Sequence, residues 1–336
     1  MNSAPMTDPQ DESAFAALVE RHRGELQVHC YRMLGSYEDS EDLVQETFLR
    51  AWHKRASYSF ERGSSLRAWL YRIATNACLD ALRGRPRRVL PQQVAAAADP
   101  RAAPAPPADL PWLQPYPDEL LAPIALPEDQ PDAVVIARET IELAFIAAIQ
   151  HLPPRQRAVL ILRDVLGWSA KETASLIEAS VASVNSALQR ARATLQDRVP
   201  KERTEWAPST GLSEDERELL RRYVDAHERA DAHGLAALLR EDARLTMPPH
   251  PTWYAGREAI VTAARKGFDP EFGRLRSVVV GANTQPAVAH YLQRPGESEY
   301  RALAFDVLRI EDRRIAEIAS FAFPGLFSAF GLPPAR

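Results

Sequence analysis

Apolar residues recur at steps of three and four along much of the chain, which is the spacing of amphipathic helices. One such run, over residues 15–33, predicts a single helix that ends at Gly35. A second helix is expected from about Asp39 and a third over 66–83, with the apolar side chains of both turned inward. Residues 13–85 are therefore predicted to form one all-α domain.

Residues 86–131 have a different composition, since they hold twelve of the 27 prolines of the chain. Proline at this density disfavours helix and sheet interiors, which predicts an extended linker. Within it Trp112, Leu113 and Tyr116 stand close together, and a flexible spacer seldom carries three such side chains. We therefore expect these three side chains to dock on a folded surface.

Residues 132–200 return to helical periodicity. A capping-box pair, Ser169 and Glu172, opens one helix, and a short turn leads to another over about 181–198. The outer side of that last helix presents polar residues: Ser183, Asn185, Ser186, Gln189, Arg190 and Arg192. The spacing over about 169–196 is that of a helix-turn-helix, and these residue types contact base edges and phosphates. An ordinary helical hairpin with a solvated face is the alternative.

Residues 213–336 change character again. Helices at about 213–230 and 235–240 precede a strand over 243–247, and another helix opens at Gly256. The runs that follow alternate and are rich in β-branched residues, which predicts antiparallel strands: Arg274–Asn283, Ala287–Leu292, Tyr300–Ile310 and Ile315–Phe323. The expected fold is thus multidomain, with two all-α domains followed by an α+β domain.

The charges are unevenly distributed, although the net charge is only −4. Residues 36–46 hold five acids and no bases, whereas residues 54–88 hold nine bases and two acids. Such asymmetry suggests two partners of opposite charge. No apolar run is long enough to span a membrane and the polar start of the chain lacks a signal-peptide pattern, so we expect a cytoplasmic protein that does not bind membranes. Cys30 and Cys78 predict buried thiols rather than a disulfide or a metal site.

Aromatic and basic residues alternate around the predicted third helix and the loop before it. The set comprises Tyr58, Phe60, Arg62, Trp69, Arg72, Asn76 and Arg83. Rings among bases suit single-stranded or melted DNA, because a ring stacks on an unpaired base. The alternative is that Trp69 and Tyr71 are core residues, and the periodicity alone does not separate the two.

The first domain resembles region 2 of the sigma-70 family, in particular its extracytoplasmic-function group. The motifs that carry the resemblance are CYRMLG at 30–35, DSEDLVQETFLRAW at 39–52, LRAWLYRIATN at 66–76 and DALR at 80–83. Residues 139–197 resemble region 4 of that family through HLPPRQR at 151–157, the helix-turn-helix, and VNSALQRAR at 184–192.

The resemblance implies a transcription initiation factor that binds core RNA polymerase, at its β′ clamp helices and β subunit, and promoter DNA. It implies no catalytic chemistry, cofactor or metal, and it leaves open whether an anti-sigma protein binds the chain. Polymerase binding falls on Asp39, Asp42, Gln45, Glu46 and Leu49. The aromatic and basic set above falls where the family opens and reads the −10 element. The polar face from Ser183 to Arg192 falls where it reads the −35 element.

The C-terminal part resembles the SnoaL-like polyketide cyclase fold, a cone of curved sheet with helices. Its ionisable candidates are His227, Asp231, His233, His290, Asp306 and Glu317. None aligns with a known catalytic pair, so surface or structural roles are expected for them. We expect this cone to regulate the sigma domains in cis. A ligand-responsive DNA-binding regulator or a fused SnoaL-like enzyme is the alternative.

Overall fold

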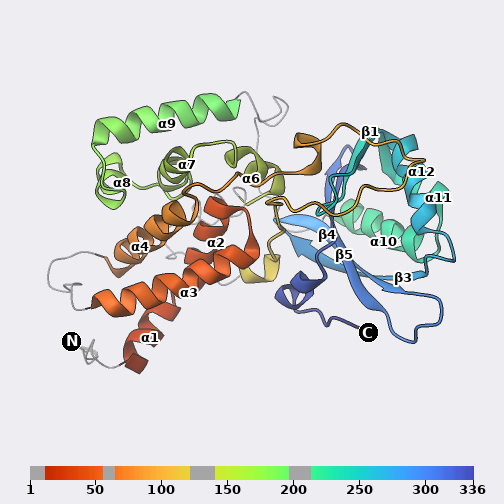
Figure 1. Cartoon of the computed structure of the whole chain (residues 1–336), viewed down its shortest axis with the longest axis horizontal. Coiled ribbons are helices and arrows are strands. Elements are labelled where there is room, and N and C mark those ends of the chain that lie inside the picture. Colours follow the sequence, from red (N-terminus) through yellow and green to blue (C-terminus); the bar gives the residue numbers. More distant parts are fainter. Residues whose placement is uncertain (1–11, 56–64, 122–140, 197–212) are drawn as a thin grey trace. The chain divides into compact units, whose positions relative to one another are not determined.

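The computed structural model describes residues 12–55, 65–121, 141–196 and 213–336 (Figure 1). The chain divides into two compact units. The first combines Met1–Arg87 with Leu120–Trp206, and the second combines Arg88–Glu119 with Ala207–Arg336. No helix within the described ranges is both long enough and apolar enough to cross a membrane.

The first half of unit 1 is a bundle of helices. They are α1 Glu12–Glu20, α2 Arg23–Leu34, α3 Tyr37–Lys54 and α4 Leu66–Ala81. The prediction of one helix over 15–33 is wrong, because the chain turns at Arg21 and His22 and starts a second helix there. The His22 Nδ1 atom lies 2.6 Å from Glu25 Oε1, and this local bond stabilises the turn. Cys30 and Cys78 are buried free thiols, as predicted.

The second half of unit 1 contains the helix-turn-helix. Its elements are α6 Leu143–Ile149, α7 Pro154–Leu160, the π-helical turn η5 Ile161–Val165, α8 Ala170–Leu176 and α9 Val181–Gln196. The predicted capping box is present at the start of α8. The Glu172 amide donates to Ser169 Oγ over 3.2 Å, and the Ser169 amide donates to Glu172 Oε2 over 2.7 Å.

A buried arginine joins the two halves of unit 1. The side chain of Arg157, on α7, is 2% exposed and donates to the carbonyl oxygen of Met33 at the end of α2. It also donates to the carbonyl oxygens of Ile149, Gln150 and Leu152, over 3.0 to 3.1 Å. Burial lowers the pKa of Arg157 to about 10, so the guanidinium stays charged at neutral pH. It therefore holds the loop between α6 and α7 against the end of α2.

A buried histidine makes unit 1 sensitive to acid. His29 is fully buried, and its Nε2 lies 2.9 Å from Thr75 Oγ1. Burial, together with the charge of Arg32, lowers its pKa from 6.5 to about 3. Between these values the unfolded state binds a proton that the folded state does not, so stability falls as the pH falls below about 6.5.

We expect acidification from pH 7 to pH 5 to cost about 2 kcal/mol of unfolding free energy through His29 alone. The wild type and His29→Gln are each unfolded with urea at pH 7 and at pH 5. The difference between their pH dependences isolates the contribution of His29, because the other titrating groups are common to both proteins. Equal pH dependence in the two proteins would exclude His29 as its source.

Unit 2 is a six-stranded sheet with helices on one face. The sheet order is β2-β1-β6-β5-β4-β3. Its strands are β1 Leu239–Thr246, β2 Trp253–Ala255, β3 Arg274–Ala282, β4 Gln285–Gln293, β5 Arg301–Glu311 and β6 Arg314–Phe321. The helices are α10 Glu214–Glu228, α11 Ala232–Leu238 and α12 Arg257–Gly267.

The boundary between the second helix and the first strand of the cone differs from the prediction. The expected helix over 235–240 ends at Leu238, and β1 begins at the next residue. The four later strands, β3 to β6, pair antiparallel as predicted, whereas β1, for which no pairing was predicted, lies parallel to β6. A parallel pair needs a crossover connection, and the intervening helix and strands supply it.

Each face of the sheet has its own apolar core. On one face Val288, Leu308 and Ile318 pack with Leu220 and Tyr223 of α10. On the other face Phe305 packs against Phe327 and Phe330 of the 3-10 helix η6 Pro324–Phe330, with ring centroids 4.3 Å apart in both pairs. Adjacent residues of a strand point to opposite faces, so Asp306 faces α10.

Candidate functional site

The outer face of α3 carries acidic and polar side chains and one exposed apolar residue, Leu49. Asp42 and Gln45 are exposed, and Leu49, one turn further on, is 56% exposed. Val44 and Thr47 point into the bundle instead. Single exposed apolar side chains are common on protein surfaces, so this face is a candidate interface because of its acidic motif rather than because of Leu49 alone.

The other two residues assigned to this surface already have intramolecular contacts. Glu46 is half-buried and accepts a hydrogen bond of 2.7 Å from Arg50. A guanidinium nitrogen of Arg85 lies 4.0 Å from Asp39. The exposed part of the predicted polymerase surface is therefore centred on Asp42, Gln45 and Leu49.

The residues predicted to meet the −10 element fall into three groups. Arg72 and Arg83 are exposed on and just after α4, and Asn76 is half-buried. Trp69 is only 6% exposed and Tyr71 only 1%, so in this structure both rings lie in the core. The remaining candidates, Tyr58, Phe60 and Arg62, lie outside the described residues.

The second helix of the helix-turn-helix, α9, exposes the predicted polar face. Its buried side carries Val184, Ala187, Leu188 and Ala191. The exposed residues are Ser183, Asn185, Ser186, Gln189, Arg190 and Arg192. Arg192 differs from the others because it makes a two-pronged ion pair with Asp164, with N–O distances of 2.7 and 2.8 Å.

This difference yields a paired prediction. Arg190→Ala should weaken promoter binding by about 1–3 kcal/mol and relax sequence preference if the guanidinium contacts a base edge. Arg192→Ala should reduce affinity less and equally on all sequences, because Arg192 is already paired with Asp164. Binding of both variants to matched and scrambled −35 duplexes, over a range of salt concentrations, measures this. A uniform loss for Arg190→Ala with a shallower salt slope would mean a phosphate contact.

The linker segment packs on unit 2, where Trp112, Leu113 and Tyr116 are all at most 4% exposed. The Tyr116 amide donates to Asn283 Oδ1 and the Asn283 amide donates to Tyr116 O, each over 2.9 Å. Asn283 has φ of 56° in the two-residue turn between β3 and β4. Asn283 is not among the residues predicted from the sequence, although an asparagine in such a turn is a recognisable signal.

The end of the linker segment is fixed to the same hairpin. Asp118 Oδ1 accepts a 2.7 Å hydrogen bond from the Thr284 amide. At Gly281 an added Cβ would lie 2.5 Å from Asp118 Oδ2, so only glycine permits this approach. Further back along the linker, Trp253 Nε1 on β2 donates to Ala95 O over 2.9 Å. Residues 88–119 are thus part of the fold of unit 2.

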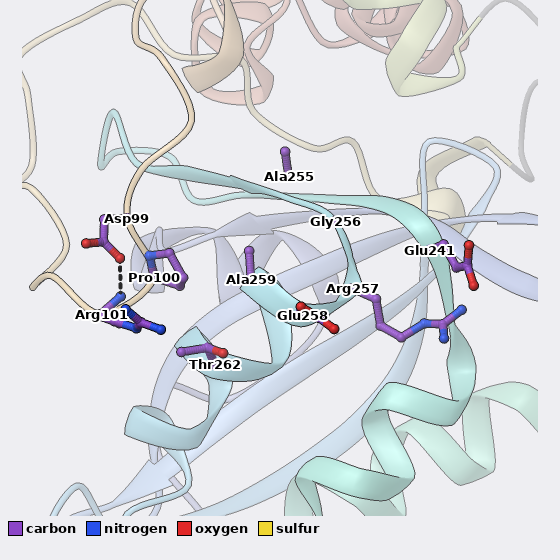
Figure 2. Close-up of a pocket in the computed structure, with 10 residues that line it drawn as sticks. All are labelled: Asp99, Pro100, Arg101, Glu241, Ala255, Gly256, Arg257, Glu258, Ala259 and Thr262. Atoms are coloured by element: carbon purple, nitrogen blue, oxygen red, sulfur yellow. Dashed lines mark hydrogen bonds between the residues drawn. The ribbon is translucent and has the colours of Figure 1, made fainter.

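Unit 2 has a pocket of about 630 Å³ beneath this linker. Figure 2 shows Asp99, Pro100 and Arg101 of the linker facing α12, with Glu241 and Arg257 further along. Arg257 Nε donates to the Leu239 carbonyl oxygen over 3.1 Å, which fixes its guanidinium. None of the six ionisable candidates of the cone lines this pocket.

Three of those six candidates meet in the interior of the cone. His290 Nε2 lies 3.0 Å from Asp306 Oδ2, which also accepts a 2.6 Å hydrogen bond from the Tyr223 hydroxyl. The ring centroids of His227 and His290 are 4.8 Å apart. His290 and Asp306 are 3% and 6% exposed, so of the surface or structural roles expected for them only the structural one agrees with their burial.

Burial and charge set the protonation of this cluster. Burial lowers the pKa of His227 to about 4, and the neighbouring His290 adds to this effect. Burial alone would raise the pKa of Asp306, but the charge and hydrogen bond of His290 outweigh it and lower that pKa. At neutral pH the cluster therefore holds an ionised Asp306 and a neutral His227.

The remaining three candidates have structural or surface positions. Asp231 caps α11 by accepting hydrogen bonds from the amides of His233 and Gly234. Glu317 accepts a 3.2 Å hydrogen bond from Arg309. His233 itself is exposed.

Comparison with known proteins matches these parts one by one. Residues 18–88 match Sigma-70 region 2, residues 142–195 match Sigma-70 region 4, and residues 220–318 match the SnoaL-like domain. The crystal structure of the extracytoplasmic function sigma factor SigJ of Mycobacterium tuberculosis has the same overall fold. It superposes with a TM-score of 0.56 at 20% identity, over 96% of this chain and 99% of that one. Fold and matches together define a sigma factor with a C-terminal SnoaL-like domain.

The relatives make the assignment more specific. The ECF RNA polymerase sigma factor SigG of Mycobacterium tuberculosis is 44% identical over 333 residues, which cover 97% of this chain and 86% of SigG. The ECF sigma factor SigW of Bacillus subtilis is 32% identical over 189 residues, covering 55% of this chain and 89% of SigW. The chain belongs to the family of ECF RNA polymerase sigma factors. Members of this family act without catalytic chemistry of their own.

Proposed function

We propose that the exposed face of α3 binds core RNA polymerase, that α4 and the loop before it contact the −10 element, and that α9 reads the −35 element. The match of residues 18–88 to Sigma-70 region 2, with Asp42, Gln45 and Leu49 exposed on α3, carries this proposal. The chain as a whole acts as an initiation factor in the cytoplasm and is not an enzyme. Its β′ and β contacts are carried over from the sigma-70 resemblance.

Run-off transcription with purified core polymerase tests this function. The expected result is promoter-specific transcripts that require both the full chain and a matched pair of elements. Transcripts that do not depend on the −35 sequence would overturn the role of α9. No transcription from any promoter selected with the holoenzyme would overturn the proposal itself.

The attachment of the linker supports regulation in cis by the cone. Residues 88–119 connect region 2 to region 4 in the sequence, yet their hydrogen bonds run to unit 2 through Asn283 and Thr284. While residues 88–119 are bound to the cone, they are not free to extend. The distance that the two proposed DNA-binding domains can move apart is then limited. Release of the linker lengthens the free tether.

Asn283→Ala tests this role without removing the cone. It deletes the bond to the Tyr116 amide, and we expect faster tryptic cleavage after Arg88 and a several-fold increase in transcription. The matched control is Asp312→Ala, in the turn between β5 and β6, where φ is likewise positive but the linker is not bound. Truncation at Ser213 is a poorer test, because it would expose the buried Trp112 and Tyr116 side chains. If both variants transcribe like the wild type although the linker is cleaved faster in Asn283→Ala, the cone does not regulate through this attachment.

A further inference from the structure

Polar side chains form a row across four neighbouring strands on the face of the sheet that α10 covers. Ser277 on β3 lies opposite His290 on β4, and Asp306 on β5 lies opposite Ser320 on β6. The residue opposite Asp306 on β4 is the apolar Val288, which belongs to the core cluster. Buried polar groups destabilise a core unless they are partnered. Their concentration at one place therefore points to a role beyond packing.

Three of the side chains at this row offer donor atoms to a common centre. One atom each from His227, His290 and Asp306 lies within 4.8 Å of the others. Asp306 Oδ1 is buried and forms no hydrogen bond of good geometry among the residues that the structure describes, although the neighbouring Ser320 side chain contributes to lowering the Asp306 pKa. An ionised oxygen left in this state is costly, because a buried acceptor loses its solvation without compensation. A cation next to it would remove that cost.

The contacts around the three side chains are those expected of metal ligands. His227 Nδ1 lies 2.9 Å from the Tyr223 carbonyl oxygen, and His290 Nδ1 lies 2.9 Å from Ser277 Oγ. Metal-binding histidines usually hold one ring nitrogen on an oxygen and coordinate through the other. In both rings the nitrogen left for coordination is Nε2. The Tyr223 hydroxyl orients the carboxylate of Asp306 in the same way.

We propose that the cone binds one late first-row divalent metal ion, Zn²⁺ or a similar ion, through His227 Nε2, His290 Nε2 and the Asp306 carboxylate. Two imidazoles and a carboxylate suit these metals better than Mg²⁺ or Ca²⁺, which prefer oxygen ligands alone. Bonds of about 2.1 Å place ligand atoms about 3.4 Å apart. His290 and Asp306 already approach this spacing, and a donor atom of His227 lies within 4.8 Å of both, so a modest closure of the three side chains completes the site.

Binding also requires His290 to change its hydrogen-bonding role. Its Nε2 atom gives up the contact with Asp306 and offers its lone pair to the metal, while the ring proton is carried on Nδ1. The Ser277 hydroxyl can accept from Nδ1 as readily as it can donate to it. A fourth position remains for water or for a ligand group. The site is independent of the proposed polymerase and DNA surfaces, so its failure would leave the sigma function standing.

The test uses the untagged full chain, freed of metal with a chelator and then titrated with Zn²⁺ and with Co²⁺. We expect one equivalent to bind, with visible d–d absorption for Co²⁺ of a four- or five-coordinate site and a rise of several degrees in the melting temperature. His227→Gln and Asp306→Asn should each lower the affinity at least about 100-fold, and Ser277→Ala about tenfold. The control His233→Ala removes an exposed histidine of the same domain and should change nothing.

X-ray absorption of the Zn²⁺-loaded wild type should show two imidazoles bound directly to the metal. This measurement does not depend on the variants, so it remains a test even if a variant fails to fold. The proposal is overturned if the wild type binds neither ion more tightly than the His227→Gln and Asp306→Asn variants do. It is equally overturned if His233→Ala alone abolishes binding. In either case the Tyr223–Asp306–His290 network is a purely structural hydrogen-bonded cluster.

Discussion

Replacement of Asp42, Gln45 and Glu46 by alanine is expected to weaken binding of core RNA polymerase at least 100-fold, or about 2.7 kcal/mol. The triple variant loses two carboxylates and one amide that would face core RNA polymerase. Charge complementarity governs both the rate and the specificity of protein association, so their loss should weaken binding. The helix should remain folded, since only the surface ion pair of Glu46 with Arg50 is removed, which contributes about 0.3–0.5 kcal/mol. Co-purification with core polymerase, or a titration followed by fluorescence anisotropy, measures the loss.

A matched control removes the same number of carboxylates elsewhere. Glu214 and Glu218 are exposed on α10 of the cone, and their double alanine variant should bind core polymerase like the wild type. Leu49→Ala should weaken polymerase binding on its own, because it removes the exposed apolar side chain of the same face. Added to the triple alanine variant of α3, it should weaken binding further. Unchanged co-purification of the triple variant would rule out α3 as the polymerase surface.

The largest effect on stability is expected at Arg157. Arg157→Leu deprives at least four carbonyl oxygens, those of Met33, Ile149, Gln150 and Leu152, of their donor. A buried acceptor without a partner costs about 1–3 kcal/mol, so the variant should lose at least about 3 kcal/mol of unfolding free energy. Lysine should not rescue it, because a single ammonium group cannot span acceptors that the planar guanidinium reaches together.

Urea denaturation followed by circular dichroism measures this loss. Arg155→Leu is the matched control, since Arg155 lies two residues earlier on α7 and is exposed. Its effect should stay within about 0.5 kcal/mol. Equal midpoints for Arg157→Leu and the wild type would mean that water satisfies the carbonyl oxygens when the arginine is absent.

Local signals in the sequence predicted most helices and strands, because they depend on neighbours within a turn or two. The Ser169–Glu172 capping box and Gly35, whose φ is 67°, are examples. What could not be predicted depends on tertiary contacts. The parallel pairing of β1 with β6 brings together segments far apart in the chain, and no period in either strand encodes its partner.

The same limit applies to the candidate sites. The surface of α3 could be predicted because its residues share one helix and a recognisable motif. The cluster in the cone could not, since Tyr223 and Asp306 are separated by 83 positions and meet only when the sheet curves around α10. Likewise, the aromatic and basic pattern could not decide between a buried and a DNA-stacking Trp69, because amphipathic spacing is the same whether a ring packs in the core or stacks on a base.

With the DNA contacts proposed for α4 and α9, the hydrogen bond between Arg157 and Met33 would make promoter binding a two-step equilibrium. Elements centred near −10 and −35 lie about 85 Å apart on B-DNA, at about 3.4 Å per base pair. Helices α4 and α9 are each about 24 Å long, and Tyr71 on α4 lies against Trp168 just before α8, with ring centroids 5.4 Å apart. If α4 contacts the −10 element and α9 the −35 element, as proposed, two such helices in one compact unit cannot reach both, and the halves of unit 1 have to separate first. If the closed form is favoured by about 2 kcal/mol, this latch lowers the apparent affinity for the promoter about thirtyfold until polymerase holds the halves apart.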